Sequence, residues 1–332
     1  MAYGYIALIA LAAFCNAAVK ELADGEVTLR LYNGADVDTY VEYNYDNAAE
    51  VTTSFGWNPA LPTVIYIHGL TESADSESVQ TVVKAYLGRA DHNILALNYP
   101  SRAKVDLGGI VVNVMLVGQA LGSILESLEA AGTDISTIHI VGFGLGPHVA
   151  ANAARSINSP ISRITGLDPA LPAFYLGDTV HIEATDAKVV DIIHSDAGVL
   201  GAAVATGTAD FYPNSGYPLQ PGCNFPFNLK SFACGTNRAW QFYAESVTNP
   251  TAFPAILCDS WTQYKVSECS NIIDHMGFGF KNTANGTYYL ETNKQSPFSK
   301  GIAGTKYDGS YLNILTARGI NALNKAIQRL LV

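Results

Sequence analysis

The stretch that most constrains the fold is residues 139–150, where an apolar run enters closely spaced glycines and then a run of small residues. Gly142, Gly144 and Gly146 permit close backbone approach, and Pro147 is tolerated in the first turn of a helix. We therefore predict a buried strand, a tight turn and a helix. This layout holds a central residue out at the mouth of a site. The central residue here is Gly144, which has no side chain to present.

Short apolar runs rich in β-branched residues recur along the chain, at 63–67, 94–98, 137–141, 161–167 and 189–194. Between them lie longer segments with helical spacing, at 77–89 and 107–131. Continuous apolar strands that alternate with helices indicate an α/β fold, a mostly parallel sheet with helices on both faces. Residues 198–300 are aromatic and rich in glycine and proline, and we expect them to form loops over the ligand-binding edge of the sheet.

The composition is that of a globular protein. Hydrophobic residues make up 48% of the 332 residues and charged residues only 14%, well below the usual charged share of roughly 25%. Disordered chains, coiled coils and nucleic-acid-binding tails need many more charges and are excluded. The 19 basic and 29 acidic residues give a net charge of −10, which argues against attraction to nucleic acid or to anionic membranes.

The N-terminus has the pattern of a secretory signal peptide. An apolar run at 6–14 ends in small residues near Ala17, and it is too short for a membrane span, which needs about 20 apolar residues. We expect residues 1–17 to be removed and residues 18–332 to form the mature domain. A buried N-terminal strand or helix is the alternative, because the usual positive charges are missing. No later stretch reads as a membrane span, so we predict a secreted, extracellular protein.

Four cysteines remain once residues 1–17 are removed, and these are Cys223, Cys234, Cys258 and Cys269. An even number in a secreted chain indicates disulfides, with three possible connectivities. The equal spacing within adjacent pairs favours Cys223–Cys234 and Cys258–Cys269. A zinc site is the alternative, although its ligands usually lie about two to four residues apart. A sequon at Asn285 would be open to glycosylation in that compartment.

The last segment, residues 310–332, has the spacing of an amphipathic helix. Its leucines and isoleucines fall on one side, whereas Arg318, Lys325 and Arg329 fall elsewhere. One interpretation is a helix that lies on a lipid surface or docks on a protein partner. The other is a helix packed on its own domain.

Several short motifs occur together in one order along the chain. They are 63–70, 166–170, 193–196, 210–216, 221–223, 288–293 and 296–298. In these motifs and in the turn at Gly144 the chain resembles the pancreatic-lipase family, especially its insect members and their yolk-protein-like relatives. The resemblance spans most of the mature chain. It implies a single α/β-hydrolase domain with a mostly parallel central sheet, and the site of an enzyme that hydrolyses lipid esters.

In such lipases a serine attacks the ester carbonyl, a histidine takes its proton and an aspartate orients the histidine. Position by position, the resemblance places the acid at Asp168, the nucleophile at Gly144 and the base at Thr236. Loss of the nucleophile or the base alone costs about 10⁶ in kcat. The backbone N–H groups of Leu70 and Leu145 match the oxyanion donors, which survive side-chain replacement. We therefore predict a catalytically inactive homologue.

Two further features follow from the resemblance. The lid corresponds to residues 223–234 and presents four apolar side chains, those of Phe225, Phe227, Leu229 and Phe232. Apolar side chains on an exposed loop suggest contact with lipid or protein, and the alternative is that they fill the old site. The calcium loop of the family corresponds to a segment whose candidate ligands are Asp178, His181, Glu183 and Asp186. An acidic loop without metal is the alternative there.

We expect a lipase homologue that binds a lipid or fatty-acyl ligand, or a protein partner, through the former active site. No cofactor, nucleic acid or transmembrane segment is expected. One alternative is an active ester hydrolase, a lipase or phospholipase of lipid catabolism, with a non-standard nucleophile. Against it, His68, His148 and His194 are expected to be structural, and no serine lies in the turn. A yolk-type storage protein without a specific ligand is the second alternative.

Overall fold

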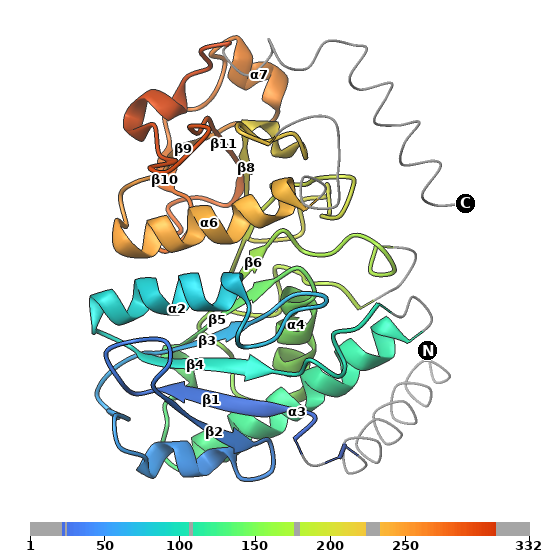
Figure 1. The fold of residues 1–332 in the computed structure, drawn as a ribbon. Coiled ribbons are helices and arrows are strands. Elements are labelled where there is room, and N and C mark those ends of the chain that lie inside the picture. The colour runs from blue at the N-terminus through green and yellow to red at the C-terminus, as the bar shows by residue number, and fades with distance from the viewer. Residues whose placement is uncertain (1–21, 24, 106–108, 176–179, 224–232, 310–332) are drawn as a thin grey trace.

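The computed structural model describes residues 22–23, 25–105, 109–175, 180–223 and 233–309 (Figure 1). In this part of the chain, eleven strands form one sheet. The strands are β1 Thr28–Tyr32, β2 Tyr40–Asn44, β3 Thr63–Ile67, β4 Asn93–Asn98, β5 Ile138–Phe143, β6 Arg163–Leu167, β7 Val189–Ile193, β8 Ala209–Pro213, β9 Pro254–Leu257, β10 Ile273–His275 and β11 Gly286–Leu290. The α-helices are α2 Glu77–Arg89, α3 Ile110–Ala130, α4 Gly146–Ser156, α6 Cys234–Thr248 and α7 Trp261–Lys265. Short 3₁₀ helices are η1 Ala48–Thr53, η2 Ile135–Thr137, η3 Asn214–Gly216 and η4 Gly301–Thr305.

The strand order is β10-β9-β11-β8-β7-β6-β5-β3-β4-β1-β2. The strands from β4 to β11 in this order run parallel, as predicted. The two strands at each edge run antiparallel. In the centre, Ile140 of β5 pairs with Ile65 of β3 and with Ile164 of β6. A parallel centre brings the carboxyl ends of these strands to one edge, where α/β sheets form their ligand sites.

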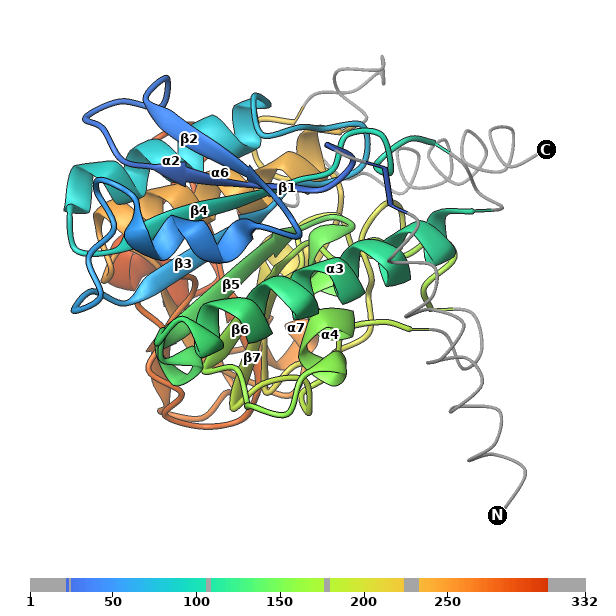
Figure 2. The same cartoon turned by 90° about the horizontal axis from the view of Figure 1, so that it is seen from below.

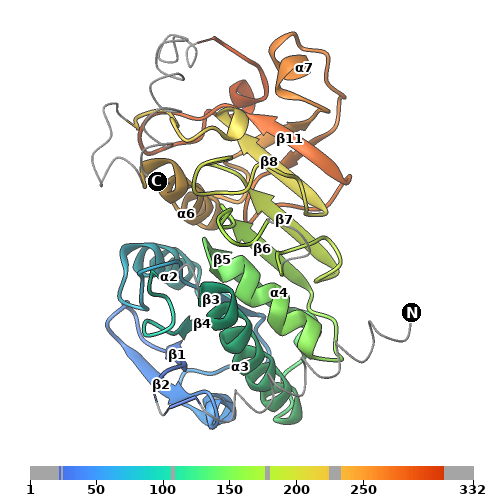
Figure 3. The same ribbon diagram turned by 90° about the vertical axis from the view of Figure 1, so that its right-hand side faces the viewer.

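Helices cover both faces of the sheet. Helices α2 and α6 pack together on one face, and α3 and α4 pack together on the other (Figure 2; Figure 3). Successive side chains of β3 point to opposite faces of the sheet. Val64 and Tyr66 belong to the core under α2 and α6. Ile65 and Ile67 belong to the core under α3 and α4. The continuous apolar run of β3 is therefore buried on both sides.

Helix α3 spans 21 residues and lies within the predicted helical segment 107–131. Within the described residues it is the one helix long and apolar enough, by length and composition, to cross a membrane. Its side facing α4 is buried in the core, and side chains at Gly118 or Gly122 would collide with Asn152 or Ser156 of α4. The expectation that no later stretch is long and apolar enough was therefore wrong for α3, whose apolar residues are largely buried against α4 and the sheet.

The last third of the domain is more regular than predicted. We expected loops from 198 to 300, but this segment contains α6 and α7 and the four strands β8 to β11. β11 pairs with β8, and the rings of Phe211 and Tyr288 stack across the pair with centroids 5.0 Å apart. The aromatic residues that suggested loops thus form the core of short strands. Such short runs carry little periodic signal in the sequence.

Both predicted disulfides are confirmed, Cys223–Cys234 and Cys258–Cys269. The first joins the loop after η3 to the start of α6, and the second links the end of β9 to the segment after α7. These pairings leave no cysteine in the described part of the chain for a zinc site. The predicted signal peptide, the lid residues Phe225, Phe227, Leu229 and Phe232, and the predicted helix 310–332 lie outside the described residues.

Candidate active-site cavity

The turn after β5 has the form that the glycine spacing predicts. β5 ends at Phe143, Gly144 takes a φ of +56°, and α4 begins at Gly146. A Cβ at Gly142 or Gly146 would collide with main-chain atoms, so neither position has room for a side chain. A Cβ at Gly144 would meet only the Cα of Gly69, at 3.6 Å, which is an ordinary contact. The central position therefore has space for a side chain that the sequence does not supply.

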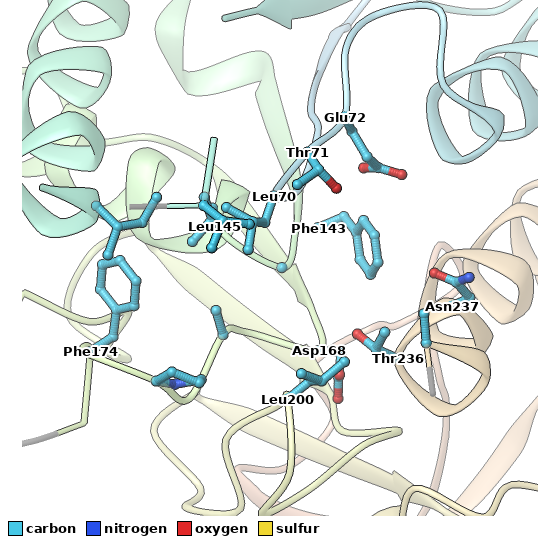
Figure 4. A pocket seen from close by; sticks show the side chains of 16 residues that line it. Leu70, Thr71, Glu72, Phe143, Leu145, Asp168, Phe174, Leu200, Thr236 and Asn237 are labelled. Carbon is cyan, nitrogen blue, oxygen red and sulfur yellow. The ribbon is translucent and has the colours of Figure 1, made fainter. Parts of the chain in front are cut away.

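Gly144 lies in the wall of a cavity of about 340 Å³ at the carboxyl ends of the central strands (Figure 4). The lining residues are Leu70, Thr71, Glu72, Val105, Ile110, Phe143, Gly144, Leu145, Asp168, Ala170, Pro172, Phe174, Leu200, Ala233, Thr236 and Asn237. Most of these side chains are apolar. Glu72, Thr236 and Asn237 lie at the end of the cavity away from Phe174 (Figure 4). The cavity is therefore amphipathic, with an apolar end and a polar end.

Two main-chain donors at the cavity lack acceptors. The N–H groups of Leu70 and Leu145 donate no hydrogen bond within the described residues. Leu145 is the N-cap of α4, where the helix dipole adds partial positive charge. Because Leu145 is buried, an unpaired N–H there is costly unless a ligand accepts from it. The two residues predicted to supply oxyanion donors thus lie on the same cavity and have free N–H groups.

Asp168 is held firmly at the end of β6. It takes a φ of +47°, and its N–H donates to the carbonyl oxygen of Ile193 at 2.8 Å. Its Oδ1 accepts from the N–H groups of Ser195 and Asp196, at 2.9 and 2.8 Å. Gly201 lies so close to the carboxyl group that a side chain there would collide with it. Asp168 is therefore a buried acid whose position is fixed by main-chain contacts.

Thr236 lies beside this acid, at the position where a base is expected (Figure 4). Burial raises the pKa of Asp168, although the Thr236 hydroxyl and the two main-chain donors act against this rise. Burial and the neighbouring Asp168 carboxyl also raise the pKa of Asp196, to about 8. The Oδ2 atoms of both aspartates lack a hydrogen bond of ordinary geometry within the described residues. The acid has thus lost the cationic partner that a histidine would provide.

Of the described residues that line the cavity, none is a histidine. His68 and His148 are fully buried, and both ring nitrogens of each are bonded to main-chain groups. Burial lowers the pKa of His68 to about 4 and that of His148 to about 3. Both rings are therefore neutral near pH 7 and already hydrogen-bonded to the main chain.

His194 also has a structural place, at the end of β7. Its Nδ1 lies 2.8 Å from the carbonyl oxygen of Ala202, and its Nε2 lies 2.8 Å from Oδ1 of Asp210. The ring stacks on Tyr212 with centroids 4.4 Å apart. These contacts join the loop after β7 to β8, so the ring is not available to the cavity.

Glu72 is a cavity residue that the sequence interpretation missed. Its Oε2 accepts from the N–H of Gly69 at 2.8 Å, and burial raises its pKa. The side chain lies on the same side of the cavity as Asn237 (Figure 4). The one available signal was its place directly after the oxyanion turn. In the sequence, an acidic residue next to Ser73 in a run of polar residues otherwise looks like a solvent-exposed surface residue.

The segment that corresponds to the calcium loop is paired with α4. The two carboxylate oxygens of Asp186 accept from Arg155 at 2.7 and 2.9 Å, and one of them also accepts from the N–H of Glu183. The described residues hold no cluster of three or more His, Cys, Asp or Glu side chains that could bind a metal. Asp178 lies outside them. Arg155 supplies to Asp186 the positive charge that a cation would supply.

The parallel sheet, the turn at Gly144 and the cavity at the strand ends define an α/β hydrolase scaffold. The lipase family matches residues 7–298 of this chain. The protein belongs to the lipase family.

Pancreatic triacylglycerol lipases are among the curated relatives. The one from Sus scrofa is 27% identical over 308 residues, covering 83% of this chain and 68% of the relative. The one from Mus musculus is 27% identical over 330 residues, covering 88% and 70%. Pancreatic lipase-related protein 2 of Cavia porcellus is 27% identical over 290 residues, covering 81% and 65%. The chain thus spans about two thirds of the length of these relatives.

A solved α/β hydrolase enzyme from a Medee basin deep-sea metagenome library is 16% identical to this chain. The match covers 53% of this chain and 67% of that chain, with a TM-score of 0.34.

The site brings the five predicted positions together, since Gly144, Asp168, Thr236, Leu70 and Leu145 all line one cavity. Its N–H groups can hold a ligand oxygen, and its apolar end can hold a hydrocarbon chain. It provides neither a nucleophile at Gly144 nor a base at Thr236.

Proposed function

We propose that this protein binds a lipid with a hydrocarbon chain in the Gly144 cavity and does not hydrolyse it. The proposal depends on one combination, an open cavity with free oxyanion donors but with glycine and threonine at the nucleophile and base positions. The second candidate is a protein partner that binds at the same cavity. Titration with lipid ligands distinguishes lipid binding from protein binding.

The lack of hydrolysis follows from the side chains. Attack on an ester needs an activated nucleophile, and loss of the nucleophile or the base alone costs about 10⁶ in kcat. Thr236 presents a hydroxyl, which does not take up a proton near neutral pH. His68 and His148 are buried and fully hydrogen-bonded. What remains is stabilisation by the N–H groups of Leu70 and Leu145, which is insufficient for turnover.

Ligand binding is supported by the size and the lining of the cavity. Its volume of about 340 Å³ lies within the usual range of small-molecule sites, roughly 300–1,000 Å³. Sites of this kind combine an apolar wall with a few placed polar groups. Phe174, Leu200 and Ile110 supply part of the apolar wall here, and the N–H of Leu145 supplies a fixed donor.

We also propose that the protein acts outside the cell, as a single mature domain of residues 18–332. The two disulfides support this location, because disulfides persist in oxidising compartments. Residues 1–17 would then act as a signal peptide. Asn285 is exposed directly before β11, so its side chain would be accessible for glycosylation.

Hydrolysis is tested on purified protein with a soluble p-nitrophenyl ester, a triacylglycerol emulsion and phospholipid vesicles. We expect rates equal to the buffer background. The double variant Gly144→Ser with Thr236→His should show a measurable rate, whereas each single variant should not. Wild-type turnover that survives purification and is lost in Asp168→Asn would overturn the proposal.

Binding is tested by native mass spectrometry of delipidated protein titrated with neutral decyl-chain ligands. We expect a one-to-one complex with the wild type. Leu200→Trp, which places a larger ring in the cavity wall, should weaken binding at least tenfold. Ile302→Trp changes an exposed residue on η4 and is the matched control. If no decyl ligand binds the wild type, a storage or protein-binding role replaces this proposal.

A further inference from the structure

The polar end of the cavity carries negative groups without basic ones. Among the described lining residues, Glu72 and Asp168 are acids, and none is Lys, Arg or His. Burial raises the pKa of both carboxyl groups, because removal from water disfavours their ionised forms. A ligand with an anionic head would bring further negative charge into the same low-dielectric space. The cavity therefore disfavours fatty-acid anions and phosphate heads.

Hydrogen-bonding groups at and near Gly144 and Thr236 line the same cavity. On one side are the free N–H groups of Leu70 and Leu145. On the other side is the Thr236 hydroxyl, next to the buried and unpaired Oδ2 of Asp168. A hydroxyl has one proton to donate and two lone pairs that accept. When Thr236 directs its proton towards Asp168, its lone pairs remain free to accept from a ligand.

A group that satisfies both sides must accept and donate at the same oxygen. A neutral alcohol does so, because its oxygen accepts from an N–H group while its proton goes to Thr236. An ester or an ether has no hydroxyl proton, so it cannot donate a hydrogen bond to Oγ1 of Thr236. Space for the alcohol oxygen exists above Gly144, where an added Cβ would meet only Gly69, at 3.6 Å.

We propose that the cavity selects a neutral ligand with a hydrocarbon chain and a terminal hydroxyl, and that Gly144 and Thr236 set this preference. The ligand oxygen accepts from the N–H of Leu145, and its proton is donated to Oγ1 of Thr236. The chain extends towards Phe174 at the apolar end (Figure 4). This inference rests on the proposed function, because it names the ligand class of the same cavity.

The experiment compares three ligands with one chain and different heads, namely decanol, 1-methoxydecane and sodium decanoate. Dissociation constants are measured at pH 7.5 by native mass spectrometry and by titration calorimetry. A hydrogen bond contributes about 1 kcal/mol, or roughly fivefold in affinity. We expect decanol to bind at least fivefold more tightly than its methyl ether and more tightly still than decanoate.

Three substitutions test which side chains cause the preference for decanol. Thr236→Val keeps the shape of the side chain but removes the hydroxyl, so decanol and 1-methoxydecane should bind within twofold of each other. Thr236→Ser keeps the hydroxyl and should restore the preference for decanol. Glu72→Gln keeps an acceptor for the Gly69 N–H while removing a charge, and it should improve the affinity for decanoate more than that for decanol.

The outcomes separate this inference from the function on which it rests. If none of the three ligands binds, or if Leu200→Trp has no effect, the proposed function fails. If all three bind and the ether or the carboxylate binds as tightly as decanol or more tightly, the lipid-binding function stands and the alcohol preference is wrong. If Thr236→Val leaves the ratio of decanol to ether affinity unchanged, the preference does not come from Thr236 and the inference fails.

Discussion

The main-chain N–H of Asp196 donates a 2.8 Å hydrogen bond to Oδ1 of Asp168, and this contact holds two buried carboxyl groups next to each other. In a lipase with its full triad, Asp168 would instead be paired with a histidine. Here Thr236 takes that place and carries no charge. The ring of His194 is bonded to Asp210 and to the carbonyl oxygen of Ala202, so it is not a hydrogen-bond partner of Asp168. The electrostatics of the site are therefore dominated by the two acids.

This pair should make stability fall as the pH rises. The pKa of Asp196 is raised to about 8 in the folded protein, whereas an unfolded aspartate has a pKa of about 3.9. Between these values the unfolded chain has released its proton and the folded protein has kept it, so the free energy of unfolding decreases from about pH 4 to about pH 8. Above pH 8 this contribution should become constant.

The variant Asp196→Asn tests that slope. The amide keeps an acceptor for the N–H of Leu200 and has a donor that can face Asp168. We expect its advantage over the wild type in urea unfolding to grow from pH 5 to pH 8 and to reach a few kcal/mol, since one pKa unit corresponds to about 1.4 kcal/mol. A constant difference across this range would contradict the raised pKa.

Gly201→Ala should strongly destabilise the protein. A methyl group there would overlap the carboxyl of Asp168, which cannot move away because Ser195 and Asp196 hold it. We expect a loss of about 2 kcal/mol or more in the free energy of unfolding. Gly88→Ala, on α2 with nothing near its Cβ, should be neutral or stabilising by up to about 1 kcal/mol. Equal effects of the two substitutions would disprove the close contact at Gly201.

Gly144→Ser should fold. The added Cβ has normal contact distances, so the expected cost is the strain of a side chain at a φ of +56°, about 1 kcal/mol or slightly more. Gly142→Ser would collide with the main chain of Gly146 and should unfold the domain or prevent expression. Thermal unfolding followed by circular dichroism measures both. A Gly144→Ser protein less stable than Gly142→Ser would show that the space for a side chain does not lie at position 144.

Calcium removal should leave the stability unchanged. Asp186, the candidate ligand with the best-defined position, has both carboxylate oxygens bonded to Arg155. We expect the same Tm in EDTA and in millimolar calcium chloride. A Tm that rises with calcium would show that the segment binds the ion, with Asp178 as a further ligand to examine. Magnesium chloride at the same concentration controls for ionic strength.

Much of the fold follows from local patterns. The apolar runs at β3, β5 and β7 and the long periodic segment at α3 predicted a parallel sheet covered by helices, and the structure has both. The equal cysteine spacing predicted both disulfides. β8 to β11 were missed, because their short aromatic runs lie among glycines and prolines. Their pairing partners, which stabilise them, are distant in the sequence.

The sequence by itself determined which side chains stand at 144 and 236, and its resemblance to lipases predicts that these are the nucleophile and base positions, because side-chain identity is a local fact. It also determined the turn, since steric limits on Gly142 and Pro147 act within a few residues. Only the tertiary structure decided that Glu72 joins Asp168 in one cavity, that Asp196 lies next to Asp168 and that Arg155 neutralises Asp186. Those relationships depend on burial and on distances between segments far apart in the chain, and such distances exist only once the sheet has formed.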